Sequence, residues 1–96
     1  MFESVALEML GEFQASMACS RRAIELNPKN GRAYFELAYV QQELPFAPEL
    51  KEAVKNYTLA LENGYHRAYV TLFNRGFARE AMNDLDGALA DYRATM

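Results

Sequence analysis

Apolar residues recur along this chain at intervals of three and four, the spacing that places them on one side of an α-helix. No segment shows the strict alternation of a half-buried β-strand. The segment 31–44 is apolar around most of its circumference, which predicts a helix layered between neighbours. The pattern therefore predicts six antiparallel helices joined by short turns. Five of them span residues 3–10, 13–26, 31–44, 48–63 and 66–82, and the sixth carries Leu85, Leu89 and Tyr92.

Glycine, proline and asparagine mark the expected ends of these helices. Gly11 can take the left-handed backbone conformation and so end the first helix. Pro28 closes the second helix, because proline has no N–H to donate and disfavours helix in the residue before it. Asn30 is a suitable N-cap for the third helix. Similar reasoning assigns a first turn to Pro48, a stop to Gly64, a tight turn to Asn83 and a cap to Asp84.

A pattern of small and aromatic residues repeats along the chain. Ala53, Tyr57 and Ala60 recur 35 residues later as Ala88, Tyr92 and Thr95, and more weakly 37 residues earlier as Ser16, Ser20 and Ala23. A further small residue precedes each copy of the pattern. Ser4 lies twelve residues before Ser16, Gly76 lies twelve before Ala88, and Ala38 lies fifteen before Ala53. The three extra residues indicate an insertion near 45–48. A repeat period in this range is typical of stacked helical arrays.

This spacing, with Asn74, Arg75 and Gly76 and the segment 24–30, resembles the tetratricopeptide repeat family, whose unit is an antiparallel helix pair of about 34 residues. The resemblance covers the whole chain. It implies a single all-α domain over 1–96, with three stacked helix pairs in a short right-handed α-solenoid. The units are about 1–30, 31–67 and an incomplete 68–96. Two departures are Thr95, where a small alanine is usual, and Gly64 with Tyr65, which replace a closing proline.

The resemblance also implies that the first helix of each pair lines a concave surface. Aromatic residues there, edged by acids, form a groove suited to a peptide or helix of a partner protein, basic or amphipathic in character. Aromatics at helical spacing are more often core residues, so burial of Phe35 and Phe73 between helices stays an alternative. The expected partner-binding residues are Phe35, Glu36, Tyr39, Gln42, Glu43, Phe73, Asn74, Phe77 and Glu80, with Met1, Val5, Glu8 and Met9 from the first unit.

One family activity has no matching residues here. Some members hold the acidic tail of heat-shock chaperones with lysine, arginine and asparagine side chains on the first helices. The corresponding positions hold Met1, Val5, Glu36, Val70 and Asn74. Glu36 would repel a carboxylate, so binding of that tail is not expected.

The end of the repeat suggests a second hypothesis. A stacked array normally finishes in a helix with a polar outer face, which hides the last apolar face from water. The chain ends inside its last helix, so either it is part of a longer array or its end pairs with another copy as a homodimer. The residues expected to self-associate are Leu85, Leu89, Tyr92 and Met96, with the segment 45–48 as a further contact.

Composition removes several other function classes. A net charge of −3 argues against nucleic acid, and the pairs Arg21 with Arg22, Lys51 with Lys55 and Arg75 with Arg79 are interpreted as solvated helix faces. Cys19 and His66 are the sole residues of their types and lie far apart, so neither a nucleophilic pair nor a zinc site is expected. Asp84, Asp86 and Asp91 lack the frame of a calcium loop. We therefore expect a cytoplasmic, non-enzymatic protein without cofactor or metal.

Overall fold

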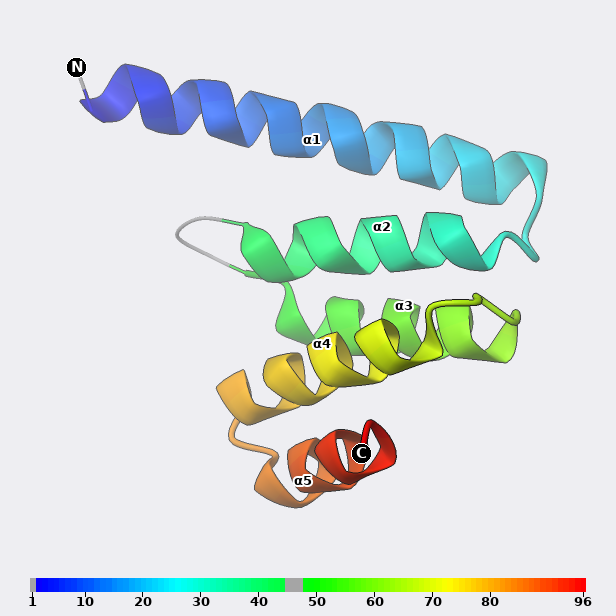
Figure 1. Cartoon of the computed structure of the whole chain (residues 1–96). Helices are drawn as coiled ribbons and strands as arrows, with labels where there is room; N and C mark the ends of the chain where they lie inside the picture. Colours follow the sequence, from blue (N-terminus) through cyan, green and yellow to red (C-terminus); the bar gives the residue numbers. More distant parts are fainter. Residues whose placement is uncertain (1, 45–47) are drawn as a thin grey trace.

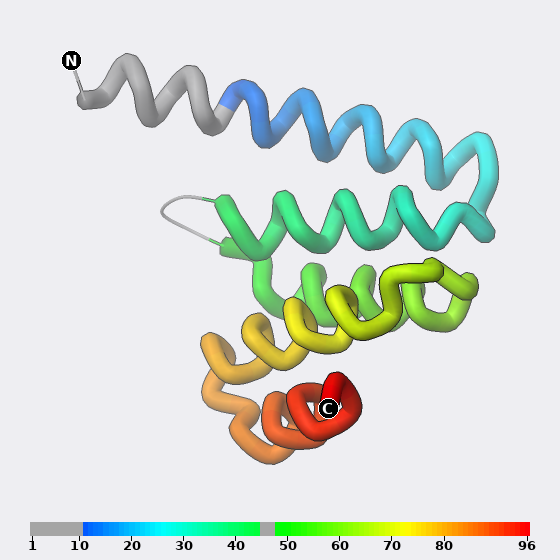
Figure 2. Tube along the Cα trace, viewed as in Figure 1, coloured from blue at the N-terminus to red at the C-terminus, as the bar shows by residue number. Residues whose placement is uncertain are grey.

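The structure is a stack of helices in which each helix packs against the next one along the chain (Figure 1). A computed structural model describes the backbone of residues 2–44 and 48–96, and the side chains of residues 11–44 and 48–96 (Figure 2). Within those ranges there are five helices and no strand. They are α1 (Phe2–Leu26), α2 (Gly31–Glu43), α3 (Leu50–Glu62), α4 (Ala68–Ala81) and α5 (Leu85–Ala94).

The expected break in the first unit is wrong, because α1 is one continuous helix of 25 residues that passes through Gly11. An interior glycine costs a helix only about 1 kcal/mol relative to alanine, and no proline follows it before Pro28. The packing that the following residues gain against α2 outweighs that small cost. The described chain therefore has one long helix followed by two helix pairs, instead of the six helices expected.

The turns after α3 and α4 are two copies of one C-terminal motif. Gly64 has φ 73 and Asn83 has φ 66, the left-handed conformation that glycine and asparagine tolerate best. After Gly64, the N–H of Tyr65 donates to the carbonyl of Ala60 at 3.0 Å. After Asn83, the N–H of Asp84 donates to the carbonyl of Arg79 at 2.8 Å. Each turn thus satisfies a helix-end carbonyl while it reverses the chain.

The predicted N-caps at Asn30 and Asp84 are confirmed. Asn30 accepts a hydrogen bond from the backbone N–H of Ala33 at 3.2 Å, and Asp84 accepts one from Gly87 at 3.1 Å. Each side chain satisfies a donor that the helix itself leaves without a partner. Asp84 both ends the turn after α4 and begins α5, which fixes the crossing of the last two helices.

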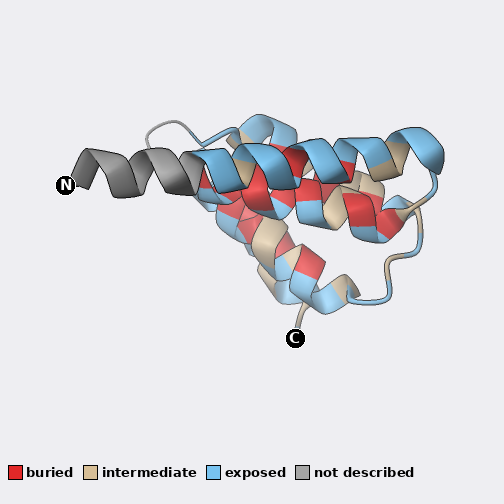
Figure 3. Ribbon diagram, turned by 90° about the horizontal axis from the view of Figure 1, so that it is seen from above, coloured by how far each residue is buried: buried red, intermediate tan, exposed pale blue. Residues whose placement is uncertain are grey.

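The core follows the two faces of α2, where buried positions are concentrated (Figure 3). This agrees with the expectation that the segment 31–44 is layered between neighbours. Toward α1, the buried cluster is Met17, Leu37, Val40 and Leu44, with Phe13 and Ile24 packed against it. Toward α3, it is Ala38, Ala53 and Tyr57, with Phe35 packed against it.

Small residues occupy the helix crossings, as the repeat predicted. Ala38, Ala53 and Ala60 are fully buried. At Gly76 a Cβ atom would lie 2.9 Å from Cε1 of Tyr92, so α5 approaches α4 closely there. Ser16, by contrast, is exposed on α1. The side chain of Ser4 and residues 45–47 of the insertion lie outside the described part of the chain.

Candidate functional site

Three of the four expected groove aromatics are open to solvent. Tyr39 on α2 is 47% exposed, and Phe73 and Phe77 on α4 are 54% and 51% exposed. The two helices contact each other and begin at the same end of the molecule (Figure 1). The alternative left open by the sequence was burial of Phe35 and Phe73 between helices; it does not hold for Phe73, whereas Phe35 is half-buried. The first helices of the two pairs present an aromatic surface.

Phe35 is the half-buried member of this set and joins the surface to the core. Its ring centroid lies 5.7 Å from that of Tyr57, 5.0 Å from that of Tyr65 and 6.3 Å from that of Tyr39. Tyr57 is fully buried, so it holds Phe35 from beneath. Ring pairs at these separations attract each other beyond simple area burial. Phe35 is therefore a rigid element with one side turned outward.

Two open hollows flank Phe35 and Glu36, which line both of them. The first, of about 300 Å³, lies at the N-terminal end of α2. The second, of about 360 Å³, lies between α1 and α2. Volumes of this size lie at the lower end of the range of ligand pockets. The first is lined by Arg32, Phe35, Glu36, Tyr65, His66 and Arg67, and the second by Ser16, Phe35, Glu36, Tyr39 and Val40.

The sequence did not predict the contributions of Tyr65, His66 and Arg67. The helix expected from residue 66 begins only at Ala68, so these three residues belong to the connection between α3 and α4. The left-handed turn at Gly64 brings Tyr65 back against the start of α2, where a Cβ on Gly31 would lie 3.1 Å from Tyr65 Cβ. The helix stop at Gly64 was the available signal, but it does not show which residues the turn brings together.

Gln42 was expected on the surface, and the structure places it inside at 8% exposure. The hydroxyl of Tyr57 donates to Oε1 of Gln42 at 2.5 Å, and Nε2 of Gln42 donates to the carbonyl of Asn74 at 3.4 Å. One amide thus joins α2 to both α3 and α4. Burial, followed by the negative charge of Glu43, raises the pKa of the Tyr57 phenol and keeps it a hydrogen-bond donor.

Charge is distributed unevenly along this surface. The exposed carboxylates Glu36, Glu43 and Glu80 lie on α2 and α4, and Glu36 is paired with Nε of Arg32 at 3.0 Å. The basic residues Arg32 and Arg67 lie instead near the beginnings of the same helices. Asn74 is half-buried. The acidic edge is therefore strongest toward the C-terminal ends of α2 and α4.

Three of the four residues expected to self-associate are exposed, two on α5 and one just after it. Leu85 is 59% exposed, Leu89 is 47% exposed and Met96, just beyond the helix, is 95% exposed. Tyr92 is half-buried, with its ring 5.6 Å from that of Phe73. Its hydroxyl donates to Oε2 of Glu80 at 3.1 Å. Burial and this hydrogen bond raise the pKa of the Tyr92 phenol.

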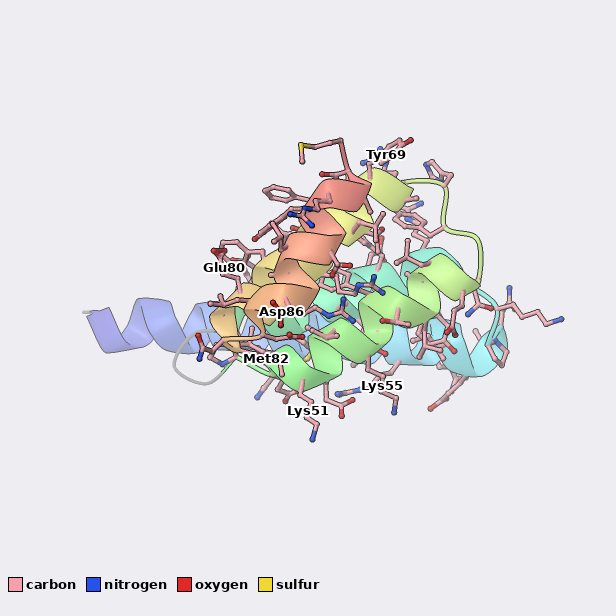
Figure 4. All side chains as sticks on the ribbon, turned by 90° about the horizontal axis from the view of Figure 1, so that it is seen from below. Lys51, Lys55, Tyr69, Glu80, Met82 and Asp86 are labelled. Carbon is pink, nitrogen blue, oxygen red and sulfur yellow. The ribbon has the colours of Figure 1, made fainter. Side chains whose placement is uncertain are left out.

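The interpretation of Arg75 and Arg79 as a solvated face is wrong. Arg75 donates twice to the carboxylate of Asp91, at 2.9 Å from Nε and at 2.6 Å from Nη2, and Arg79 donates to it at 2.9 Å. Asp91 is 3% exposed. The buried carboxylate needs these partners, so the arginines fasten α4 to α5. The other two pairs, Arg21 with Arg22 and Lys51 with Lys55, are exposed as interpreted, and Figure 4 shows the lysines projecting from α3.

The remaining candidates add no chemistry to this surface. The side chains of Val5, Glu8 and Met9, and the whole of Met1, lie outside the described residues. The thiol of Cys19 is exposed on α1. No cluster of three or more histidine, cysteine or acidic residues able to hold a metal occurs among the described side chains. No helix in the described part of the chain is long and apolar enough to cross a membrane.

Comparison with known families supports the repeat. Residues 19–62 match a family model described as tetratricopeptide repeat. The match covers the end of α1 together with all of α2 and α3. Repeats of this family generally mediate protein–protein interaction and are typically non-enzymatic. No curated protein matches the chain. The resemblance drawn from the repeat spacing and from the segment 24–30 is confirmed over residues 19–62.

Proposed function

We propose that this chain, which carries a tetratricopeptide repeat at residues 19–62, binds a peptide or short helix of a partner protein across α2 and α4. The supporting observation is the set of half-exposed rings Tyr39, Phe73 and Phe77 on two adjacent helices. Their place on the first helix of each pair is where the solenoid geometry would put a concave face. The chain then acts as an interaction module and performs no chemistry.

The rigidity of this surface favours binding. A bound segment gains most from a few well-packed anchors, and aromatic side chains are prominent among them. Phe35 is already held by Tyr57 and Tyr65, so little side-chain freedom is lost when a ligand packs on it. The two hollows beside Phe35 can each receive one apolar side chain of the ligand.

The charge distribution suggests the direction of the bound segment. Glu43 and Glu80 lie at the C-terminal ends of α2 and α4, where the helix dipoles are also negative. Arg32 and Arg67 lie at the opposite ends. A ligand with a basic end over the glutamates and a neutral or acidic end over the arginines is therefore favoured. This refines the expectation of a basic or amphipathic partner.

The test is capture of short peptides that carry two leucine or phenylalanine anchors between basic, acidic or mixed flanks. The double substitution Tyr39→Ala with Phe77→Ala removes two anchors and should weaken capture about tenfold or more, since a lost anchor costs about 1 to 2 kcal/mol. Titrations followed by fluorescence anisotropy or by backbone amide shifts measure the effect.

A control separates binding from folding. Leu26→Ala removes an apolar side chain that is 75% exposed on α1, away from this surface, and should leave capture unchanged. Circular dichroism should give the same helicity for all variants. Full capture by the Tyr39 and Phe77 double variant would remove these rings from the site. Equal affinity for basic and acidic flanks would remove the charge argument alone.

A further inference from the structure

We propose that α5 pairs in an antiparallel manner with α5 of a second copy of this chain, along a seam of Leu85, Leu89, Tyr92 and Met96. The proposal does not depend on peptide binding, because it uses a face of α5. Figure 4 shows α5 as the front layer of the stack when the molecule is seen from below, with no other helix across it.

The internal repeat allows the seam residues of α5 to be compared with the equivalent residues of α3. Leu50, Val54, Tyr57 and Leu61 of α3 stand 35 residues before the four seam residues. Tyr57 is buried and the other three are half-buried, and α4 packs on α3. Their counterparts Leu85, Leu89 and Met96 are exposed. The seam is thus the α5 version of a face that is at least half-buried at each position on α3.

The two layers also agree in their internal contacts. The ring of Tyr57 lies 5.7 Å from that of Phe35, and the ring of Tyr92 lies 5.6 Å from that of Phe73. The Tyr57 hydroxyl donates to Gln42, and the Tyr92 hydroxyl donates to Glu80. The α4–α5 layer therefore repeats the α2–α3 layer, and its outer face is equally suited to a packed helix.

The spacing of the seam favours pairing with another helix. Its residues are separated by four, three and four positions, which is the a/d spacing of two helices that pack along their length. Asp86 and Arg93, both exposed, flank the seam on one side. The other flank is Ala88, which is buried, and Thr95, which is half-buried.

Self-complementarity identifies a second copy as the occupant. In an antiparallel pair, Leu85 of one copy faces Met96 of the other, and Leu89 faces Tyr92. Arg93 of the mate then lies level with residue 88, about 3 Å along the axis from Asp86 on the same flank, so two opposite-charge pairs form by symmetry. In a parallel pair these charges stay about 10 Å apart along the axis, since they are seven residues apart. The charge order thus selects the antiparallel dimer.

The seam is short, so the dimer should dissociate on dilution, with a Kd in roughly the micromolar range. Sedimentation velocity over a dilution series of the full chain measures this equilibrium. Leu89→Ser replaces a central seam residue with a polar one and should weaken the dimer about tenfold or more. Lys55→Ser, a matched change on the exposed face of α3, should leave the equilibrium unchanged.

Charge reversal gives a test that a change in folding cannot imitate. Asp86→Arg alone, or Arg93→Asp alone, places like charges together twice and should weaken the dimer by several fold. The double variant D86R with R93D restores both opposite-charge pairs and should recover most of the wild-type affinity. Circular dichroism checks that each variant keeps its helicity.

Three results would overturn the proposal. The first is a wild-type chain that stays monomeric at millimolar concentration. The second is a dimer that Leu89→Ser does not weaken, which would place the interface elsewhere. The third is a double charge variant no tighter than either single variant. Because the seam excludes Tyr39 and Phe77, failure here leaves the peptide-binding proposal standing, and the reverse also holds.

Discussion

Two glycines, Gly11 and Gly76, differ in whether the packing around them leaves room for a side chain. Gly11 lies within α1, and a Cβ built on it meets no atom within 4 Å apart from its own helix. Gly76 lies at the α4–α5 crossing, where the same atom would meet Cε1 of Tyr92 at 2.9 Å and Cβ of Asp91 at 3.2 Å. Only the second glycine is required by packing.

The matched substitutions Gly11→Ala and Gly76→Ala should therefore have opposite signs. Gly11→Ala should raise the free energy of unfolding by about 0.5 to 1 kcal/mol, because alanine is the better helix former. Gly76→Ala should lower it by about 1 to 3 kcal/mol, because the added methyl forces α5 away from α4. Urea denaturation followed at the helical band measures both. A Gly76→Ala variant as stable as wild type would mean that α5 can move away from α4 without loss of stability, which would contradict this prediction.

Tyr57 is the buried ring that supports Phe35, and its hydroxyl is committed to Gln42. The fold raises the pKa of this phenol above its ordinary value of 10.0, mainly through burial. Below that value both the folded and the unfolded state hold the proton. Above it the unfolded chain releases the proton while the folded chain retains it, so stability falls as the pH rises.

Tyr57→Phe should accordingly have two effects. At neutral pH it should destabilise the fold by about 1 to 2 kcal/mol, because the buried Gln42 oxygen loses its donor. Above pH 10.0, the ordinary tyrosine value, it should flatten the alkaline loss of stability seen in wild type. Denaturation midpoints on both sides of that value give the comparison. A Tyr57→Phe variant that keeps the full wild-type alkaline loss of stability would contradict this assignment.

Polar contacts connect successive helices in addition to the apolar ones. Between α2 and α3, Nδ2 of Asn56 donates to Oε1 of Gln41 at 2.8 Å, and both side chains are buried. Between α3, α4 and α5, Arg75 binds both Thr58 and Asp91. No buried side-chain N or O in the described residues lacks a hydrogen-bond partner. Such fully satisfied joints fix the register of each helix on the next.

Asp91→Asn tests the joint between the last two helices. It removes the charge that two arginines share, and should lower the free energy of unfolding by about 3 kcal/mol, since loss of one partner leaves buried charge uncompensated. Glu25→Gln removes one partner of the Arg22–Glu25 pair, whose side chains are 72% and 71% exposed, and should change stability by less than about 0.5 kcal/mol. Equal effects in the two variants would refute a structural role for Asp91.

At the scale of the whole molecule, the chain is a short layered stack with two kinds of unused surface. Its extents of 42 × 33 × 18 Å describe a flat body, as expected when helices are added along one direction. The proposed peptide surface lies across the first helices α2 and α4. The proposed dimer seam lies on α5, where the stack has no further layer among the described residues. The two surfaces meet only at Phe73 and Glu80, which both contact Tyr92.

The sequence by itself determined the local features of this protein. The helical class, the caps at Asn30 and Asp84, the turns at Gly64 and Asn83 and the small residues at the crossings depend on backbone preference and period. These properties depend on residues within about one helical turn of each other, so they can be predicted without knowing which distant residues pack nearby. Three local expectations failed. The stop at Gly11 did not occur, because the cost of an interior glycine was too small to end a helix. Pro48 lies before the first turn of α3, which begins at Leu50, and α4 begins at Ala68 instead of residue 66.

Only the tertiary structure decided which way the polar and aromatic side chains face. Gln42 turns inward because Tyr57 and Asn74, 15 and 32 residues away, supply its hydrogen bonds. Arg75 is structural because Asp91, 16 residues away, is buried beside it. Phe35 is half-buried, whereas its repeat counterpart Phe73 is more open, because Tyr65 covers the first ring. Burial is a property of the neighbours that folding brings together, and helical period alone does not contain it.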